Sequence, residues 1–295
     1  MQSLWMVLAS LIFATMGVCV KIASEFFNSS ELVFYRGLVG VLFMGAFARL
    51  QGIPLKTPVP MMHAWRSSIG VLSLGAWFYA IAHLPLATAM TLNYMSSVWI
   101  AAFLVGGALL LNRGPQTGSQ GPLVMTILAG FSGVVLMLRP TIDQNQTFAG
   151  LVGLMSGIGA AFAYMQVMAL ARTGEPDVRT VFYFAVGTVI AGGIAMAITG
   201  LTPWNWNHAR WLLPVGVLAS LGQLCMTRAY SRGSTLVVAS LQYSGIIFAA
   251  LYSVALFGDK ITPMGWGGMA LIVASGIGAT ILRSRAAPDS PAEDH

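Results

Sequence analysis

Charged residues are scarce in this sequence. Asp, Glu, Lys and Arg make up 8% of the 295 residues, whereas a soluble globular protein carries about 25%. A soluble fold could not keep its surface hydrated with so few charges, because the large apolar patches left between them would aggregate. The shortage of charge therefore excludes an ordinary soluble protein and predicts an integral membrane protein.

Patterns typical of catalytic, metal and nucleic-acid sites are also missing. The two cysteines, Cys19 and Cys225, lie inside apolar segments and are expected to be buried thiols. The four histidines have no second ligand at metal-binding spacing, and no Gly-Lys-Ser/Thr motif follows the glycines. Lys and Arg do not cluster with interleaved aromatic residues. We therefore expect no catalytic residues, no metal, no cofactor and no nucleic-acid partner.

Long apolar runs are what the sequence has in abundance. A helix needs about 20 mostly apolar residues to cross a bilayer, whereas a β-barrel would show short alternating segments. Turn sequences such as Gln51-Gly52-Ile53-Pro54 separate the runs. The pattern predicts an all-α protein with ten transmembrane helices, the first being a retained span and not a signal peptide. The helices are expected at 3–22, 31–50, 64–83, 86–111, 122–139, 148–171, 179–200, 210–230, 234–257 and 263–283.

The basic residues predict the orientation of the chain. Cytoplasmic loops of membrane proteins carry an excess of Lys and Arg. With a cytoplasmic N-terminus, four basic residues fall on the outer side (Lys21, Arg139, Arg210 and Lys260) and ten on the cytoplasmic side (Arg49, Lys56, Arg66, Arg113, Arg172, Arg179, Arg228, Arg232, Arg283 and Arg285). The sequence thus favours cytoplasmic N- and C-termini, with a disordered tail over 286–295.

The two halves of the chain resemble each other. Val33-Phe34-Tyr35 recurs as Val181-Phe182-Tyr183, and Thr91-Leu92-Asn93-Tyr94 aligns with Ser240-Leu241-Gln242-Tyr243. Five spans per half is an odd number, so the second half must enter the membrane from the opposite side. This predicts two inverted repeats, 1–141 and 148–285, a design that gives a transporter one conformation open to each side.

At these residues the sequence resembles the EamA-type members of the drug/metabolite transporter superfamily. The resemblance is strongest from Ser240-Leu241-Gln242-Tyr243 to Phe257-Gly258-Asp259-Lys260, and Phe34-Tyr35-Arg36 also fits. It implies ten helices in two inverted halves and secondary transport of a small organic solute, often outward. The sequence departs from the family where relatives carry a proline in helices four and nine. Ser97 and Ile246 stand there, so any bend must come from Ser96-Ser97 or Ser244-Gly245.

One charge is predicted well inside a span. Arg36 lies about one turn into the second expected helix, and ionisable groups at such depth need a partner or a cavity. Arg36 could attract an anionic solute, or it could bind backbone carbonyls and helix ends in a structural role. The sequence leaves both interpretations open.

Polar and aromatic residues gather on the third, fourth, sixth, eighth and ninth spans. Asn93 and Gln242 each offer a donor and an acceptor for a zwitterionic or amide-bearing solute, and aromatic rings suit apolar or cationic groups. Contacts between helices, or simple core packing, would explain the same residues. The predicted solute site comprises Tyr79, Thr91, Asn93, Tyr94, Trp99, Tyr164, Gln166, Gln223, Gln242 and Tyr243.

The sequence therefore predicts a secondary transporter, working as an exporter, that moves a small organic metabolite across the bacterial inner membrane by alternating access. Its solute site is expected at the midplane between the repeats. The expected partners are a small-molecule solute and the lipid bilayer, and the oligomeric state is left open between monomer and homodimer. The alternative is a membrane-embedded enzyme or a lipid-handling scaffold that transports nothing.

Overall fold

The computed structural model describes residues 4–100, 102–103, 125, 128–130, 132–133, 136, 146–233, 238 and 241–286. All regular structure within these residues is helical. The expected span 122–139, apart from single positions, and the second part of the span 86–111 lie outside the described residues, as do the start of the ninth span and the tail beyond 286.

The helices begin and end close to the predicted turns, and local signals account for several of the ends. Asn28 and Glu31 form a reciprocal capping box at the start of the second helix. Pro60 opens the third helix, and Gly258 ends another in the left-handed conformation, at φ 65°. The helices are α1 (Trp5–Ala23), α2 (Ser29–Leu50), α3 (Pro60–His83), α4 (Leu86–Tyr94), α7 (Thr147–Arg172), α8 (Asp177–Thr199), α9 (Trp206–Ala209), α10 (Leu212–Arg232), α12 (Ser244–Phe257) and α13 (Pro263–Ala286).

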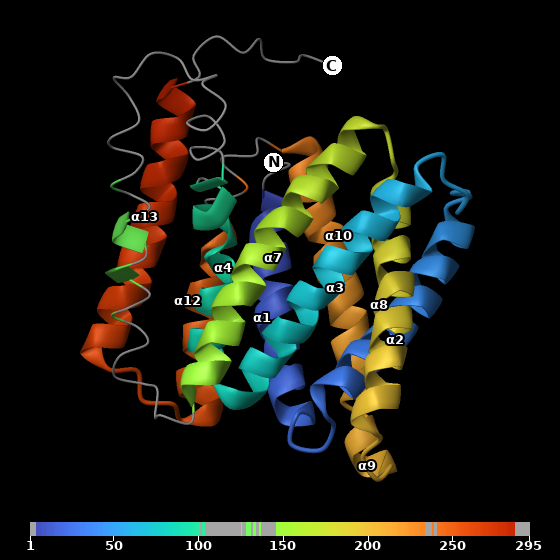
Figure 1. Ribbon diagram of the computed structural model, residues 1–295, viewed down its shortest axis with the longest axis horizontal. Helices are drawn as coiled ribbons and strands as arrows, with labels where there is room; N and C mark the ends of the chain where they lie inside the picture. Colours follow the sequence, from blue (N-terminus) through green and yellow to red (C-terminus); the bar gives the residue numbers. More distant parts are fainter. Residues whose placement is uncertain are drawn as a thin grey trace.

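The long helices stand side by side in one bundle (Figure 1). The most extensive packing pairs are α2 with α8, α3 with α7, and α1 with α10, and α4 packs against α12 and α7. We call the end of the bundle where α3 and α8 begin the Arg179 end, at the top of Figure 1, and the end where α2 begins the Glu31 end. The start of α1 and the end of α13 both lie at the Arg179 end.

The outer surface of the bundle is apolar. Leu42 on α2 and Ile198 on α8 are 67% and 81% exposed, and Ile190 and Ile194 precede Ile198 at helical spacing on the same face. Among the residues that the structure describes, five segments are long and apolar enough to cross a membrane: α1, α2, α7, α8 and the stretch Trp206–Arg232 that contains α9 and α10. Apolar side chains outside and polar ones inside are what a bilayer requires.

The fourth and ninth spans are each interrupted at corresponding places. A one-residue turn at Met95 follows α4, and a turn at Tyr243 precedes α12. Ser96-Ser97 follows Met95, and Ser244-Gly245 follows Tyr243. These are the residues from which the sequence predicts a bend. At this level α4 and α12 approach closely, because a Cβ on Gly245 would come within 2.5 Å of the Tyr94 ring.

Candidate functional site

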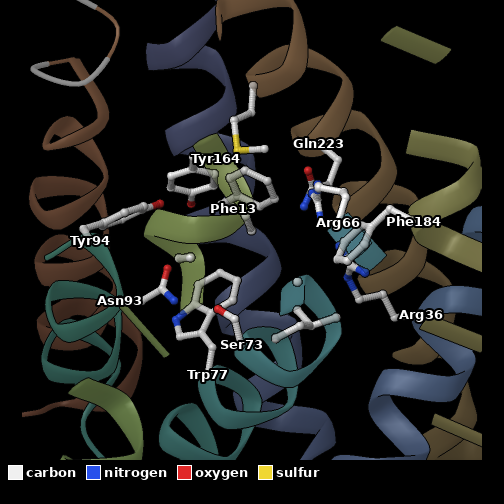
Figure 2. Close-up of a pocket in the computed structure, with 15 residues that line it drawn as sticks. Phe13, Arg36, Arg66, Ser73, Trp77, Asn93, Tyr94, Tyr164, Phe184 and Gln223 are labelled. Atoms are coloured by element: carbon white, nitrogen blue, oxygen red, sulfur yellow. The ribbon is translucent and has the colours of Figure 1, made fainter. Parts of the chain in front are cut away.

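A cavity lies in the middle of the bundle. Its walls come from α1, α2, α3 and α4 in the first half of the chain and from α7, α8 and α10 in the second. Its free volume is about 50 Å³, which holds only a few water molecules. Figure 2 shows the side chains that surround it. The lining residues are Phe13, Arg36, Arg66, Gly70, Ser73, Leu74, Trp77, Asn93, Tyr94, Ala160, Ala163, Tyr164, Phe184, Gln223 and Met226.

Two arginines face this cavity. Arg36 on α2 is 4% exposed and Arg66 on α3 is 3% exposed. Both guanidinium groups pack against the ring of Phe184 on α8, with their central carbons 5.3 and 4.0 Å from the ring centroid, and in the view of Figure 2 the ring lies between them. Such contacts contribute about 2 kcal/mol when desolvated, less than the several kcal/mol that burying each ion costs.

Gly70 makes room for one of these guanidinium groups. A Cβ at this position would collide with the Arg66 guanidinium and come within 2.9 Å of the Phe184 ring. Gly70 lies four residues after Arg66 on α3 and therefore on the same helix face. The missing side chain lets Arg66 fold along its own helix towards the cavity.

Hydrogen bonds between α3, α4 and α7 fix the amide of Asn93. Its Nδ2 donates to the Ser156 hydroxyl at 3.1 Å, and Ser156 in turn donates to the Gly153 carbonyl at 2.6 Å. Ser73 donates to the Ser156 carbonyl at 2.8 Å. Gly157 permits this approach, because a Cβ there would lie 2.5 Å from the Leu92 carbonyl oxygen. The contacts of α7 with α4 and with α3 therefore hold the polar wall of the cavity in place.

The structure brings part of the predicted site to the cavity. Arg36, Asn93, Tyr94, Tyr164 and Gln223 all line it. They come from α2, α4, α7 and α10, helices that are distant in sequence. Both halves of the chain thus contribute polar groups to one cavity.

The other predicted residues lie elsewhere. Gln242 accepts a hydrogen bond from the Tyr230 hydroxyl at 2.9 Å and donates to Ser96 at 3.3 Å. Thr91 donates to a carbonyl of its own helix, and Tyr79 stacks on His83 with the ring centroids 4.1 Å apart. The hydrogen bonds of Gln242 join separate segments of the bundle, and the contacts of Thr91 and Tyr79 join successive turns of their own helices. Outside the cavity lining are Tyr79, Thr91, Trp99, Gln166, Gln242 and Tyr243.

Sequence reasoning missed Arg66 and placed Arg36 too near a helix end. The second and third helices begin at Ser29 and Pro60, earlier than the expected 31 and 64, so each arginine lies about two turns inside its helix. The Asn28 cap and the proline at the first helical position were the available signals. Arg36 is therefore not the only charge deep within a helix.

A polar cluster lies at the Arg179 end of the bundle. Arg179, at the start of α8, donates to the Pro54 carbonyl through Nε at 2.9 Å and Nη2 at 2.7 Å. Its Nη1 lies 3.1 Å from the Glu175 carboxylate, which also accepts from Thr57 at 2.9 Å and contacts His63 Nε2 at 3.1 Å. Burial opposes ionisation of Glu175, but the His63 and Thr57 hydrogen bonds and the Arg179 charge outweigh it and lower the Glu175 pKa.

A second cluster lies at the Glu31 end. Glu31, at the start of α2, accepts hydrogen bonds from the backbone nitrogen and the hydroxyl of Thr202, each at 3.0 Å. Asn28 donates to the Gly200 carbonyl at 3.1 Å. The start of α2 thus holds the loop that follows α8, just as the start of α8 holds the loop that follows α2. Among the described residues, no three His, Cys, Asp or Glu side chains come together as metal ligands would.

Comparison with known proteins identifies the family. The profile of the EamA-like transporter family matches residues 1–139 and 147–281. The chain is 35% identical over 249 residues to the pseudopaline exporter CntI of Pseudomonas aeruginosa, covering 83% of each protein. It is 26% identical to a riboflavin transporter of Rhizobium johnstonii, covering 93% of this chain and 89% of that one.

A solved crystal structure shows the same fold. It matches with a TM-score of 0.69 at 18% identity and covers 95% of this chain and 98% of the other. The family match spans nearly the whole chain, and the named relatives are transporters, which removes support from the enzyme and scaffold alternatives. The chain therefore belongs to the EamA-like transporter family and is an integral membrane transporter of small metabolites, not an enzyme.

Proposed function

We propose that this protein exports a small organic metabolite across the bacterial inner membrane by alternating access, with the central cavity as its solute site. A bacterial relative named as an exporter, 35% identical over most of both chains, supports the outward direction. The proposed topology has ten helices, in repeats 1–141 and 148–285, with both termini in the cytoplasm.

The packing of the helices is the observation that carries this proposal. Suppose that α1 corresponds to α7, α2 to α8, and α3 to α10. Exchanging each helix for its counterpart then converts the pair α3–α7 into α10–α1. It likewise converts the pair α2–α10 into α8–α3. All four of these pairs pack against each other. The helices α1 and α7 also run in opposite directions (Figure 1). Both facts support two inverted repeats related by a pseudo-two-fold axis.

The two end clusters obey the same relation. Glu31 and Arg179 are 148 positions apart, and so are Thr202 and Pro54, the residues that they hold. Each end of the α2–α8 pair is therefore tied by a charged side chain at the start of one helix, which hydrogen-bonds the loop that follows the other helix, although Arg179 donates and Glu31 accepts. Corresponding ties at opposite ends suit a carrier whose two open states are related by a pseudo-two-fold axis.

The size of the cavity supports a conformational cycle. A space of about 50 Å³ cannot contain an organic metabolite, whereas ligand pockets generally measure about 300–1,000 Å³. With both end clusters formed, the structure corresponds to a contracted state between the two open ones. Solute binding then requires one end to separate while the other stays closed.

Within this proposal the solute contacts are Arg36, Asn93, Tyr94, Tyr164 and Gln223, which line the cavity. The remaining predicted residues lie outside the cavity lining, and we assign them the role of positioning the residues that contact the solute. They are Tyr79, Thr91, Trp99, Gln166, Gln242 and Tyr243.

Labelling of a cysteine in the cavity tests alternating access. In a background with Cys19 and Cys225 replaced by serine, Ser73→Cys places one thiol on the cavity wall. We expect a membrane-impermeant methanethiosulfonate to modify it from either face, in right-side-out and in inside-out vesicles. Ser10→Cys is the matched control, because Ser10 is fully buried and does not line the cavity. Modification of Ser73→Cys from one face only, or from neither, would contradict the proposal.

A further inference from the structure

We propose that Arg36 and Arg66 together bind a carboxylate group of the transported solute, so that the protein carries organic acids. This inference rests on the proposed function, because it assigns a substrate class to the same cavity. Both arginines are more than nine-tenths buried, and both line that cavity.

The two side chains come from opposite ends of the bundle and meet at one depth. Arg36 lies seven residues into α2, about 10 Å from the Glu31 end, and Arg66 lies six residues into α3, about 9 Å from the Arg179 end. Their guanidinium groups nevertheless lie 5.3 and 4.0 Å from the centre of the same Phe184 ring. Two positive charges are therefore held near the middle of the bundle.

Neither charge has a protein counter-ion among the described residues. Glu31 and Glu175 belong to the two end clusters, Asp177 pairs with Arg228 and Arg232, and Asp259 accepts from Ser253. Within the described part of the chain, no carboxylate forms an ion pair with Arg36 or Arg66. An uncompensated buried charge is costly, and an anion in the cavity would remove this cost.

Unused hydrogen-bond donors point the same way. The Nε atom of Arg36, and the Nε and one Nη atom of Arg66, are buried without a partner among the described residues. A planar guanidinium presents its N–H groups in a fork that matches the two oxygens of a carboxylate. Two such forks facing one cavity form a site for one carboxylate shared between them, or for two carboxylates of one solute.

The rest of the lining favours a carboxylate over a phosphate. Phosphate sites commonly use backbone N–H groups at a helix N-terminus, whereas every lining residue here lies inside a helix, away from its first turn. Phe13 and Trp77 supply an aromatic wall in edge-to-face contact, with ring centroids 6.3 Å apart. The site therefore suits a small acid with an apolar or aromatic body, and the amides of Asn93 and Gln223 can bond its other polar groups.

The test compares acids with their uncharged amides. The melting temperature of the purified full-length protein is measured with phenylacetate against phenylacetamide, succinate against succinamide, and phenyl phosphate, all at constant ionic strength. We expect the carboxylates to raise it and the amides to leave it unchanged. Arg36→Gln and Arg66→Gln should each weaken carboxylate binding about tenfold or more, because each removes a charged fork. Arg49→Gln, a change at an exposed position on α2, should leave binding unchanged.

Each other outcome overturns the assignment. These are amides that act like acids, a stronger response to phenyl phosphate, no response to any probe, or an equal loss in Arg49→Gln. If the Gln variants do not fold, Arg36→Lys and Arg66→Lys keep the charge but lose the fork, and they should bind carboxylates more weakly than wild type. Labelling of Ser73→Cys from the two faces does not depend on the solute. It therefore separates a failure of this inference from a failure of the transport cycle.

Discussion

Breaking one end cluster should open that end of the bundle and leave the other closed. Arg179→Gln removes two hydrogen bonds from a charged donor to the Pro54 carbonyl, 2.9 and 2.7 Å long, and a 3.1 Å ion pair with Glu175. Hydrogen bonds to charged groups contribute about 1.5–3 kcal/mol each, so about 3 kcal/mol is a low value for the whole loss. Since 1.4 kcal/mol corresponds to a factor of ten, the open state at this end should gain about a hundredfold in population.

The counterpart change should act in the opposite direction. Glu31→Gln weakens the bonds to Thr202 at the Glu31 end and should favour the state open there. The assay is the modification rate of Ser73→Cys by an impermeant reagent applied to each face in turn. Arg179→Gln should accelerate the reaction from the face at the Arg179 end, and Glu31→Gln should accelerate it from the other face.

The matched control is Arg172→Gln, which replaces an exposed arginine at the end of α7. It should change neither rate. The reasoning is refuted if Arg179→Gln and Glu31→Gln accelerate labelling from the same face, or if Arg172→Gln has an effect as large as theirs.

Three further predictions concern stability and the solute site. Gly157→Ala should lower the free energy of unfolding by about 1–3 kcal/mol, measured in detergent, because its Cβ would press on the Leu92 carbonyl. Because the Glu175 pKa is lowered in the folded state, its stabilisation should be present above its unfolded pKa of about 4.3 and be lost as the pH falls through the lower folded pKa. A thermal melt series should show this acid loss reduced in Glu175→Gln, and an unchanged series would contradict it. Asn93→Ala should reduce solute binding and lower the free energy of unfolding by about 1 kcal/mol, for the lost Ser156 hydrogen bond. Gln242→Ala loses two hydrogen bonds outside the cavity, so it should lower stability more and leave binding unchanged; equal binding losses would place both residues at the solute.

Much of the fold could be predicted from sequence because each helix leaves a local signal. The apolar runs and the turn residues located the described helices to within a few positions, and the serine and glycine pairs located the interruptions near Met95 and Tyr243. These signals depend on neighbours in the chain. They do not say which faces of distant helices meet.

The candidate site depended on such distant contacts. The sequence aligns Asn93 with Gln242, yet only Asn93 lines the cavity, because Gln242 is held by Tyr230 and Ser96. The approach of two arginines from separate helices to one ring of a third leaves no pattern in the sequence. Hydropathy assigned Arg66 to a helix end, although Pro60 signals an earlier helix start, and the packing of α3 against its neighbours turns Arg66 towards the cavity.

The cavity is less symmetric than the bundle around it. Arg36 and Arg66 both belong to the first half of the chain, and the residue 148 positions after Arg36 is Phe184, the ring on which both guanidinium groups rest. An organic acid bound there would keep its charged end towards the first half in every conformation. The solute would then cross without turning over, and it would leave by the far side in the same orientation, relative to the protein, in which it arrived.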